Sequence, residues 1–307
     1  MTTRTVIGGP CIVKHGEHWY ETSTDVTVTP VTETRVITSS LRGPVSRRVT
    51  DKTVTVAFTP LGRLRGLDAY YPFGPADLGK LIAPAPDTDI TVWGADGVRH
   101  DYKAAVLSAA PELILSANNG PFGAMTFTAM GALTKNTAAD GSMFTASAAP
   151  ISGYDYDLSD LHTPGYKLEL LDGGTVTQTI DSREGFTFNP GYTLEPYRVD
   201  AYGTVNYRLT GIDPALTFLP AGPDVAKLYE LLRFQGPGAA QIGEANALGL
   251  AARVSPVTGP GVTLDFPDCQ LTAAALNYGP SADRLGEWTL NPVPGENAVP
   301  FTLSITD

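Results

Sequence analysis

The sequence predicts a mainly β protein built from two tandem domains of the same kind. Short runs that alternate apolar and polar side chains are frequent, and 32 glycines and 25 prolines among 307 residues favour many strands joined by turns. Motifs of the first half also recur in the same order in the second half. Because a chain of this length ordinarily divides into two domains, we predict an N-terminal domain over 1–147 and a C-terminal domain over 148–307.

The first pair of repeated motifs consists of two alternating segments. TVTVAFT at 53–59 and TVNYRLT at 204–210 lie 151 positions apart, and each presents apolar side chains on one face only. This period of two is typical of a half-buried strand. A Gly-Pro pair follows each segment, at 74–75 and at 222–223.

Two later motifs extend the repeat. Asn-Asn-Gly-Pro at 118–121 is matched by Asn-Tyr-Gly-Pro at 277–280, and GAMTF at 123–127 is matched by GEWTL at 286–290. The offsets grow to 159 and 163 positions, which small insertions explain. The shared order indicates an internal duplication.

A short helix is expected after each Gly-Pro pair. Apolar residues follow at the i, i+3, i+4 spacing that gathers side chains on one face of a helix. These residues are Leu78, Leu81 and Ile82 in the first half and Leu228, Leu231 and Leu232 in the second. We therefore expect one flanking α-helix per domain, the first over 76–82.

A long hairpin is predicted near the N-terminus. Its arms are 26–40 and 45–59, and a Gly-Pro turn lies at the tip. The tip carries positive charge in an otherwise acidic chain, which suits either a solvated loop or docking on an acidic neighbour. The residues concerned are Leu41, Arg42, Gly43, Pro44, Arg47 and Arg48.

The second half contains an apparent counterpart of this hairpin. A strand near 175–180 is followed by GFTFNPG at 185–191, where glycine and proline again indicate a turn but no arginine cluster is present. The residues we assign to this weaker tip are Phe186, Asn189, Pro190 and Gly191.

Further strands are expected in the rest of the first half. Segments 89–93 and 98–102 form a hairpin around Asp-Gly, while 113–116 and 123–129 are single strands. The small and polar segment 135–149 is either a linker or a segment that closes the domain.

Two segments suggest no chemistry. The Gly/Ala-rich segment 235–246 has no counterpart in the first half and is expected to be a loop, while the acidic segment 155–162 does not match the EF-hand pattern. No catalytic motif is present, so we expect no enzyme activity, no cofactor and no metal site.

Charge and cysteine content limit the function further. A net charge of −11 argues against a protein that grips nucleic acid by its phosphates. The two cysteines, Cys11 and Cys269, suit a reducing compartment better than a disulfide scaffold. No signal segment or membrane span is predicted, which favours folding in a cytoplasm.

Three stretches of the first half resemble one protein family. LRGPVSRRVTDKTVTVAFTPLGRL at 41–64, YYPFGP at 70–75 and GAMTFTAMGAL at 123–133 resemble the major tail tube proteins of siphophage-like, long-tailed bacteriophages. The resemblance reaches the second half through the duplication. It implies β-sandwich or barrel-like domains, each flanked by a helix.

The resemblance also implies a structural role in the virion tail. Such subunits form rings that stack into a hollow tube, through which DNA passes during ejection without specific binding. Two tandem domains imply a homotrimeric ring with pseudo-sixfold symmetry, assembled in the host cytoplasm. The implied partners are other copies of the chain and the tape measure, tail terminator and baseplate proteins, with no membrane.

Within this family, the long hairpin typically reaches an adjacent ring. The resemblance therefore implies an inter-ring contact at the tip residues 41–48, with Phe186–Gly191 as the weaker counterpart.

Three alternatives remain open. A related tail ring protein, such as a distal tail or baseplate component, has the same sequence features. A two-domain carbohydrate-binding or adhesin module could use the aromatic pairs at 19–20 and 70–71 to stack on sugars. A hydrolase on a β scaffold would need a pair of carboxylates, which no spacing singles out.

Overall fold

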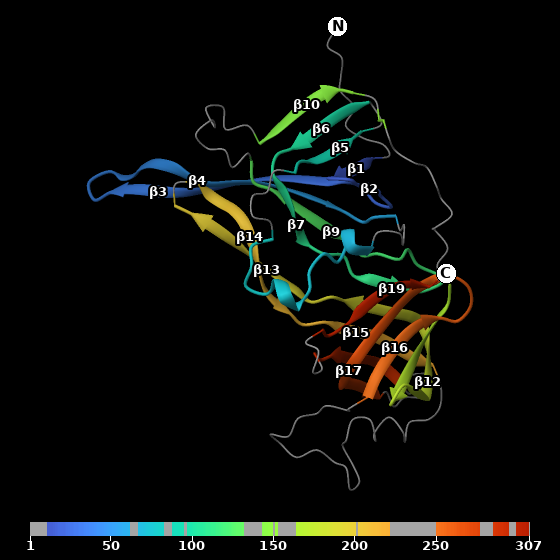
Figure 1. The fold of residues 1–307 in the computed structure, drawn as a ribbon. Coiled ribbons are helices and arrows are strands. Elements are labelled where there is room, and N and C mark those ends of the chain that lie inside the picture. Colours follow the sequence, from blue (N-terminus) through green and yellow to red (C-terminus); the bar gives the residue numbers. More distant parts are fainter. Residues whose placement is uncertain are drawn as a thin grey trace, which may run out of the picture.

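The computed structural model is built almost entirely of antiparallel strands over the residues that it describes (Figure 1). These residues are 11–61, 67–82, 88–94, 97–131, 143–149, 151–152, 164–200, 202–221, 250–276, 285–294 and 299–306. The mainly β fold class is thereby confirmed.

The ten described strands of the first half form two sheets, except for β8, which joins the sheet of the second half. They are β1 (Ile12–His15), β2 (His18–Glu21), β3 (Thr27–Ser39), β4 (Gly43–Phe58), β5 (Ile90–Trp93), β6 (Val98–Tyr102), β7 (Ala105–Ala109), β8 (Leu113–Leu115), β9 (Met125–Ala129) and β10 (Phe144–Ala148). One sheet has the order β10-β6-β5-β1-β2 and the other the order β3-β4-β9-β7. The two sheets meet where Tyr20 packs against Phe58 and Phe127, with ring centroids 5.7 and 5.9 Å apart.

The nine described strands of the second half form a path of six that closes on itself, a seventh strand that pairs with this path, and a separate two-stranded ribbon. They are β11 (Tyr166–Asp172), β12 (Thr175–Asn189), β13 (Tyr192–Val199), β14 (Gly203–Ile212), β15 (Ala215–Ala221), β16 (Leu250–Pro256), β17 (Gly261–Leu276), β18 (Leu285–Pro292) and β19 (Thr302–Thr306). The order β11-β16-β17-β18-β15-β12 returns to β11 through a β11–β12 pairing, which makes a barrel. Its interior includes Phe188 against Phe266 and Phe218 against Trp288.

One long hairpin occurs in each half with the same register. In the first half it is β3–β4, and in the second it runs from the end of β12 through β13 and returns through β14 and β15. The pairing Thr27↔Ala57 recurs 160 residues later as Thr187↔Thr217. At the far end, Ser39↔Gly43 recurs as Val199↔Gly203.

The irregularities of the two hairpins coincide as well. Register shifts follow Glu33 and Ile37 in the first, and Thr193 and Tyr197, 160 residues later, in the second. Only the second hairpin loses regular pairing around Pro190, where β12 gives way to β13. Matching bulges in two strands of unlike sequence are strong evidence for one duplicated unit.

The remaining strands follow the same plan. β1 pairs with β5 as β11 pairs with β16, and β9 pairs with β4 as β18 pairs with β15. β10 lies beside β6 as β19 lies beside the start of β17. Even the isolated bridge Leu113↔Phe122 recurs, as Leu276↔Leu285. The two halves thus repeat one strand order.

The register corrects one part of the sequence comparison. Residues 53–59 correspond to 213–219 rather than to 204–210, because the offset in the hairpin is 160 and not 151. Alternating strands resemble one another in any register, so 204–210 matched although it lies farther out along the hairpin.

The helix predicted over 76–82 was wrong. Only Pro75–Asp77 forms a single 3₁₀ turn, and Gly79 then adopts a φ of +78°. The following backbone pairs with β14 instead, since Gly79 N–H donates to the Leu209 carbonyl over 2.8 Å and Ile82 N–H donates to that of Tyr207 over 2.9 Å. The second predicted helix, at 224–232, lies outside the described residues.

Several other predictions are confirmed. β3 and β4 match the arms 26–40 and 45–59, and β5 pairs with β6 as the predicted hairpin. β8 and β9 match the two single strands, and β10 makes the end of 135–149 a closing strand rather than a linker. Segments 155–162 and 235–246 lie outside the described residues.

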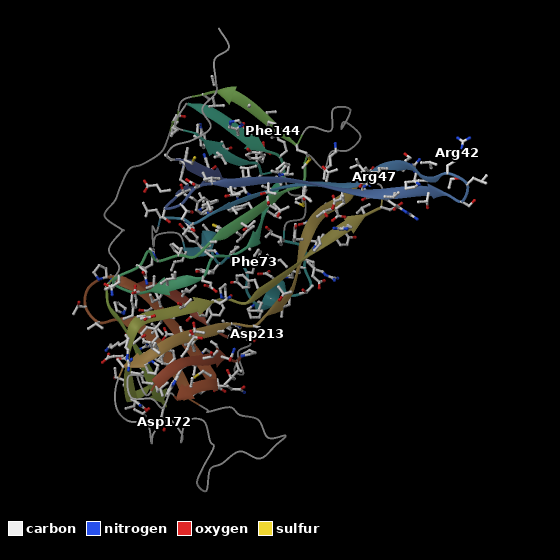
Figure 2. The ribbon with its side chains drawn as sticks, turned by 180° about the vertical axis from the view of Figure 1, so that it is seen from behind. Arg42, Arg47, Phe73, Phe144, Asp172 and Asp213 are labelled. Atoms are coloured by element: carbon white, nitrogen blue, oxygen red, sulfur yellow. The ribbon has the colours of Figure 1, made fainter. Side chains whose placement is uncertain are left out.

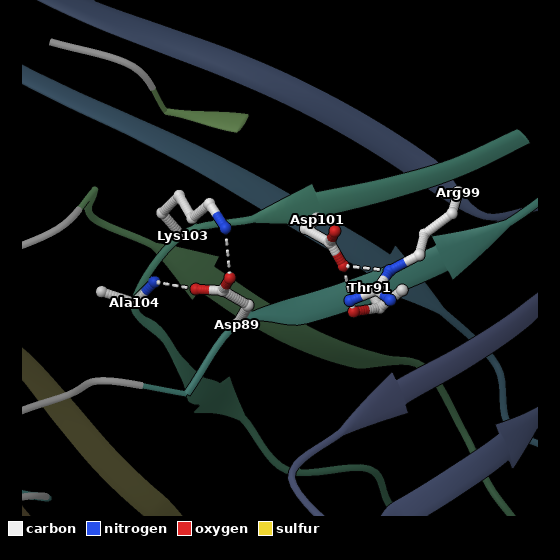
Figure 3. Close-up of polar contacts among 6 residues, drawn as sticks. All are labelled: Asp89, Thr91, Arg99, Asp101, Lys103 and Ala104. Atoms are coloured by element: carbon white, nitrogen blue, oxygen red, sulfur yellow. Dashed lines mark hydrogen bonds and ion pairs between the residues drawn. The ribbon is translucent and has the colours of Figure 1, made fainter. Parts of the chain in front are cut away.

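The chain leaves one sheet of the first half for the other at Ala104. This residue has a φ of +53°, which is unusual for a side chain with a Cβ. The Asp89 carboxylate holds the junction, because it accepts a hydrogen bond from Ala104 N–H over 3.1 Å and pairs with Lys103 Nζ at 2.5 Å (Figure 3). On the neighbouring stretch, Asp101 accepts from Thr91 and Arg99.

Asp89→Ala should lower the free energy of unfolding by about 1–3 kcal/mol, because it leaves the Ala104 amide without its acceptor. Urea denaturation followed by circular dichroism measures this. Asp172→Ala, at the exposed end of β11, is the control and should change stability little. Equal effects of the two substitutions would contradict the role of Asp89.

Candidate functional site

The two long hairpins project from the sheets and form the candidate site. We call β3, β4 and their turn the first arm, and β13, β14 and their turn the second arm. Figure 1 shows the first arm extending far from the body of the molecule, with the second arm beneath it. A contact between the two arms, and not a pocket, defines the site, and it brings together Asp51 of the first arm and Thr204 of the second.

The tip of the first arm is fully exposed. Leu41 is 93% exposed, and Figure 2 shows Arg42 at the far end with Arg47 further back. The other predicted tip residues, Gly43, Pro44 and Arg48, are exposed as well. The arm thus presents apolar and positively charged side chains together, away from its own core.

The predicted counterpart of this tip was placed wrongly. Phe186 is only 1% exposed and belongs to the core, so its side chain does not form a tip. Asn189 donates to Glu112 over 3.2 Å and accepts from Gly191 N–H, next to the buried Pro190. These residues form the base of the second arm, since the register equates 186–191 with 26–31.

The true counterpart of the first tip is the turn between β13 and β14. There the positions of Arg42 and Arg47 are taken by Tyr202 and Tyr207, and only Arg48 keeps an arginine, Arg208. The two arms therefore share a backbone register but differ in the chemistry of their tips. Glycine and proline occur both at the tip of a hairpin and at the break in pairing around Pro190, so these residues alone did not show which of the two they marked.

The second arm contacts the middle of the first through Asp51. This carboxylate is 7% exposed and accepts hydrogen bonds from Thr204 N–H over 3.0 Å and from Thr204 Oγ1 over 2.5 Å. Arg198 Nη2 lies 3.7 Å from the same carboxylate. Asp51 and Thr204 both lie in stretches that the sequence analysis quoted, but no pattern pointed to a contact between them, about 150 positions apart.

An ion pair extends this contact toward solvent. Arg198 donates two hydrogen bonds to the Glu33 carboxylate, over 3.0 and 2.8 Å. These hydrogen bonds raise the pKa of Arg198, with the charges of Glu33 and Asp51 acting in the same direction. Because both side chains are about half exposed, the pair contributes more to orientation than to stability.

Gly203 allows the close approach of the arms. Its φ is +73°, and a Cβ there would lie 2.4 Å from Asp51 Oδ1. Gly43 occupies the same place in the first arm with a φ of +69°, yet a Cβ there would meet nothing within 4 Å. The same turn is therefore packed in one arm and open in the other.

A cavity of about 380 Å³ lies beside the arms, against β1, β2, β7 and β14. His15 lines it, and because a carbonyl oxygen only accepts, His15 Nε2 carries the proton and donates to the Ala105 carbonyl over 2.9 Å. Its ring lies 4.7 Å from that of Phe127. Burial lowers the pKa of His15, and the charge of His18 acts in the same direction.

Buried Cys269 has no nucleophilic character at neutral pH, because burial raises the pKa of its thiol to about 12. Within the described ranges, no three His, Cys, Asp or Glu side chains lie close enough together to hold a metal ion. No helix in the described part of the chain is both long and apolar enough to cross a bilayer.

The aromatic pairs that a carbohydrate-binding module would use have other contacts. Tyr70 and Tyr71 are buried, and Tyr71 donates to the Pro111 carbonyl over 3.1 Å. Trp19 stacks on Trp93 at 5.1 Å, with Lys14 over its ring. These rings serve packing within the chain.

Comparisons with known proteins add no assignment. No protein-family model matches the chain. No curated protein matches it with significant similarity either.

Gly43→Ala and Gly203→Ala form a matched pair that tests the contact between the arms. Each should cost about 1 kcal/mol because alanine disfavours a positive φ. Gly203→Ala should cost about 1–3 kcal/mol more, since Asp51 must move away from Thr204. Denaturation gives the two costs, and hydrogen exchange should show faster exchange of the Thr204 amide in Gly203→Ala only. Equal costs would contradict the contact.

The stability of the protein should depend on His15 at mildly acidic pH. Because the folded protein lowers the pKa of His15, the unfolded chain takes up the proton first. The stabilisation is therefore complete above the ordinary pKa of 6.5 and is lost as the pH falls through the lowered value. Unfolding free energies at pH 8 and pH 5 measure the loss, which should shrink in His15→Gln but persist in His18→Gln. An unchanged loss in His15→Gln would refute the assignment.

Proposed function

We propose that the chain is a structural virion protein, the major tail tube subunit of a siphophage-like particle. In this proposal, homotrimers form pseudo-hexameric rings that stack into the hollow conduit for DNA delivery. The observation that carries the proposal is the repeated arm: two copies of one β unit lie in contact within the chain, and the arm of the first projects from it.

The contact between the two units favours assembly beyond one chain. The first unit contributes Asp51 and β8, whereas the second contributes Thr204 near its tip and the edge of β12. Different surfaces of the two units thus meet. In such a heterologous contact, each unit uses one of two different surfaces and leaves the other one free. Repetition of the contact through the free surfaces produces rings or filaments.

The charge distribution suits a conduit. A net charge of −11 would let DNA pass without binding, while the basic tip formed by Arg42, Arg47 and Arg48 could pair with acidic side chains of an adjacent ring. The proposal places the protein in the virion tail after assembly in the host cytoplasm. Tape measure, tail terminator and baseplate proteins would be its other partners.

Negative-stain electron microscopy of the purified protein at high concentration tests the proposal, with light scattering on the same sample. Hollow tubes with a threefold or pseudo-sixfold cross-section are the expected result. Single rings that never lengthen would favour a distal tail or baseplate ring protein instead. A monomer that binds glycans on an array would favour the adhesin alternative.

The double substitution Arg47→Glu with Arg48→Glu should prevent stacking while leaving the fold intact, because it reverses the charge of the first arm's tip. Tube length by electron microscopy measures the effect, and circular dichroism checks the fold. Arg47→Lys with Arg48→Lys keeps the charge and is the matched control, which should still form tubes. Tubes of full length from the glutamate variant would remove the tip from the proposal.

A further inference from the structure

We propose that a second copy of this chain docks on the outer edge of β3, at residues 26–29, by adding a strand there. The inference rests on the self-association proposed above, and it names the surface and the partner. It follows from a contact that the chain already makes within itself.

The template for this docking is the pairing of β8 with β12. Phe186 lies opposite Leu115, and Phe188 lies opposite Leu113, so a strand of the first half extends the sheet of the second. All four side chains are at most 1% exposed. This edge of the second arm's base is therefore completely covered.

Within the described parts of the chain, no strand covers the equivalent edge of the first arm. The offset of 160 equates Phe186 and Phe188 with Val26 and Val28, at the base of the first arm. Among the described residues, β3 pairs with β4 only. Val26 and Val28 pack against the core but are only partly buried, as expected for a sheet edge to which a further strand could be added.

Proline defines which backbone groups face this edge. Pro30 lies opposite Val54 within the ladder, and because it has no N–H, its nitrogen must point away from β4. Backbone groups alternate along a strand, so the N–H and C=O of Val28 point away from β4 as well. They are the groups that an added strand would use.

The length of the open edge also matches. Pro190 stands where Pro30 does in the first arm, and the pairing of β12 with β8 stops at Phe188, two residues before it. Pro30 should limit an added strand at the same place. A short edge ended by proline accepts a specific partner while resisting indiscriminate pairing.

The repeat also identifies the occupant. β8 lies between β7 and β9 along the chain, and its first residue, Leu113, is one partner of the bridge Leu113↔Phe122. The second half repeats this bridge as Leu276↔Leu285, with the same separation of nine positions. The second half of another copy is therefore the partner that repeats the intrachain contact.

Hydrogen exchange on the full-length protein, dilute and assembled, tests the docking. Assembly should slow exchange of the Val28 amide at least about tenfold, because an added strand hydrogen-bonds it. Exchange of the Thr29 amide, which points toward β4, should be slow in both samples.

Two proline variants provide the matched comparison. Val28→Pro removes the outward N–H but leaves the ladder with β4, and it should weaken association by about tenfold or more in analytical ultracentrifugation. Val36→Pro lies farther out on the same strand, where the second arm already carries Pro196, and should associate like the native chain. Circular dichroism checks that both variants fold.

The outcomes separate this inference from the proposed function. Tubes in which the Val28 amide exchanges as fast as in the dilute protein would overturn the docking but leave the tail tube proposal intact. Protection of Val28 in an oligomer that forms no tube would support the docking and count against the proposed function. A chain that stays monomeric at its highest soluble concentration would overturn the docking.

Discussion

The register of the two arms is the constraint on which the rest of the fold depends. Because side chains alternate between the faces of a strand, a slip of one residue would turn Val54, Val56 and Phe58 out of the core. The same bulges recur in both arms, together with a left-handed glycine where each second strand begins. These features fix where each strand begins to pair. The next strand of each sheet, β9 beside β4 and β18 beside β15, takes its register from them.

The same backbone plan has been kept in two copies whose side chains have diverged at the points of contact. Glu33 and Asp51 receive the tip of the second arm, whereas the equivalent positions carry Thr193 and Gly211. A tip like that of the second arm would find no carboxylate there. The two units are consequently not interchangeable, although their strands pair in the same order.

Much of the architecture was predictable from local patterns. The limits of the first arm and the β5–β6 hairpin follow from alternation and turn residues. The register of the repeat did not follow, because an alternating strand matches another equally well when shifted by several residues. The helix after Gly74-Pro75 failed for a different reason. Three apolar residues made the pattern, but Gly79 interrupts it and β14 offers the backbone better partners.

The contact between the arms was beyond the reach of sequence patterns. Asp51 and Thr204 belong to different halves, and neither stands in a motif that sets a buried carboxylate apart from an exposed one. Only the three-dimensional course of both arms brings them together. The same holds for the open edge of β3, which becomes recognisable once its covered equivalent on β12 is known.

The placement of both units on one polypeptide has a kinetic consequence. The contact between Asp51 and Thr204 forms within the chain, at an effective concentration set by the covalent connection and independent of protein concentration. In the ring proposed above, every second contact between units would therefore be made before two chains meet. Growth of such a ring would need fewer bimolecular encounters, which would lower its nucleation barrier.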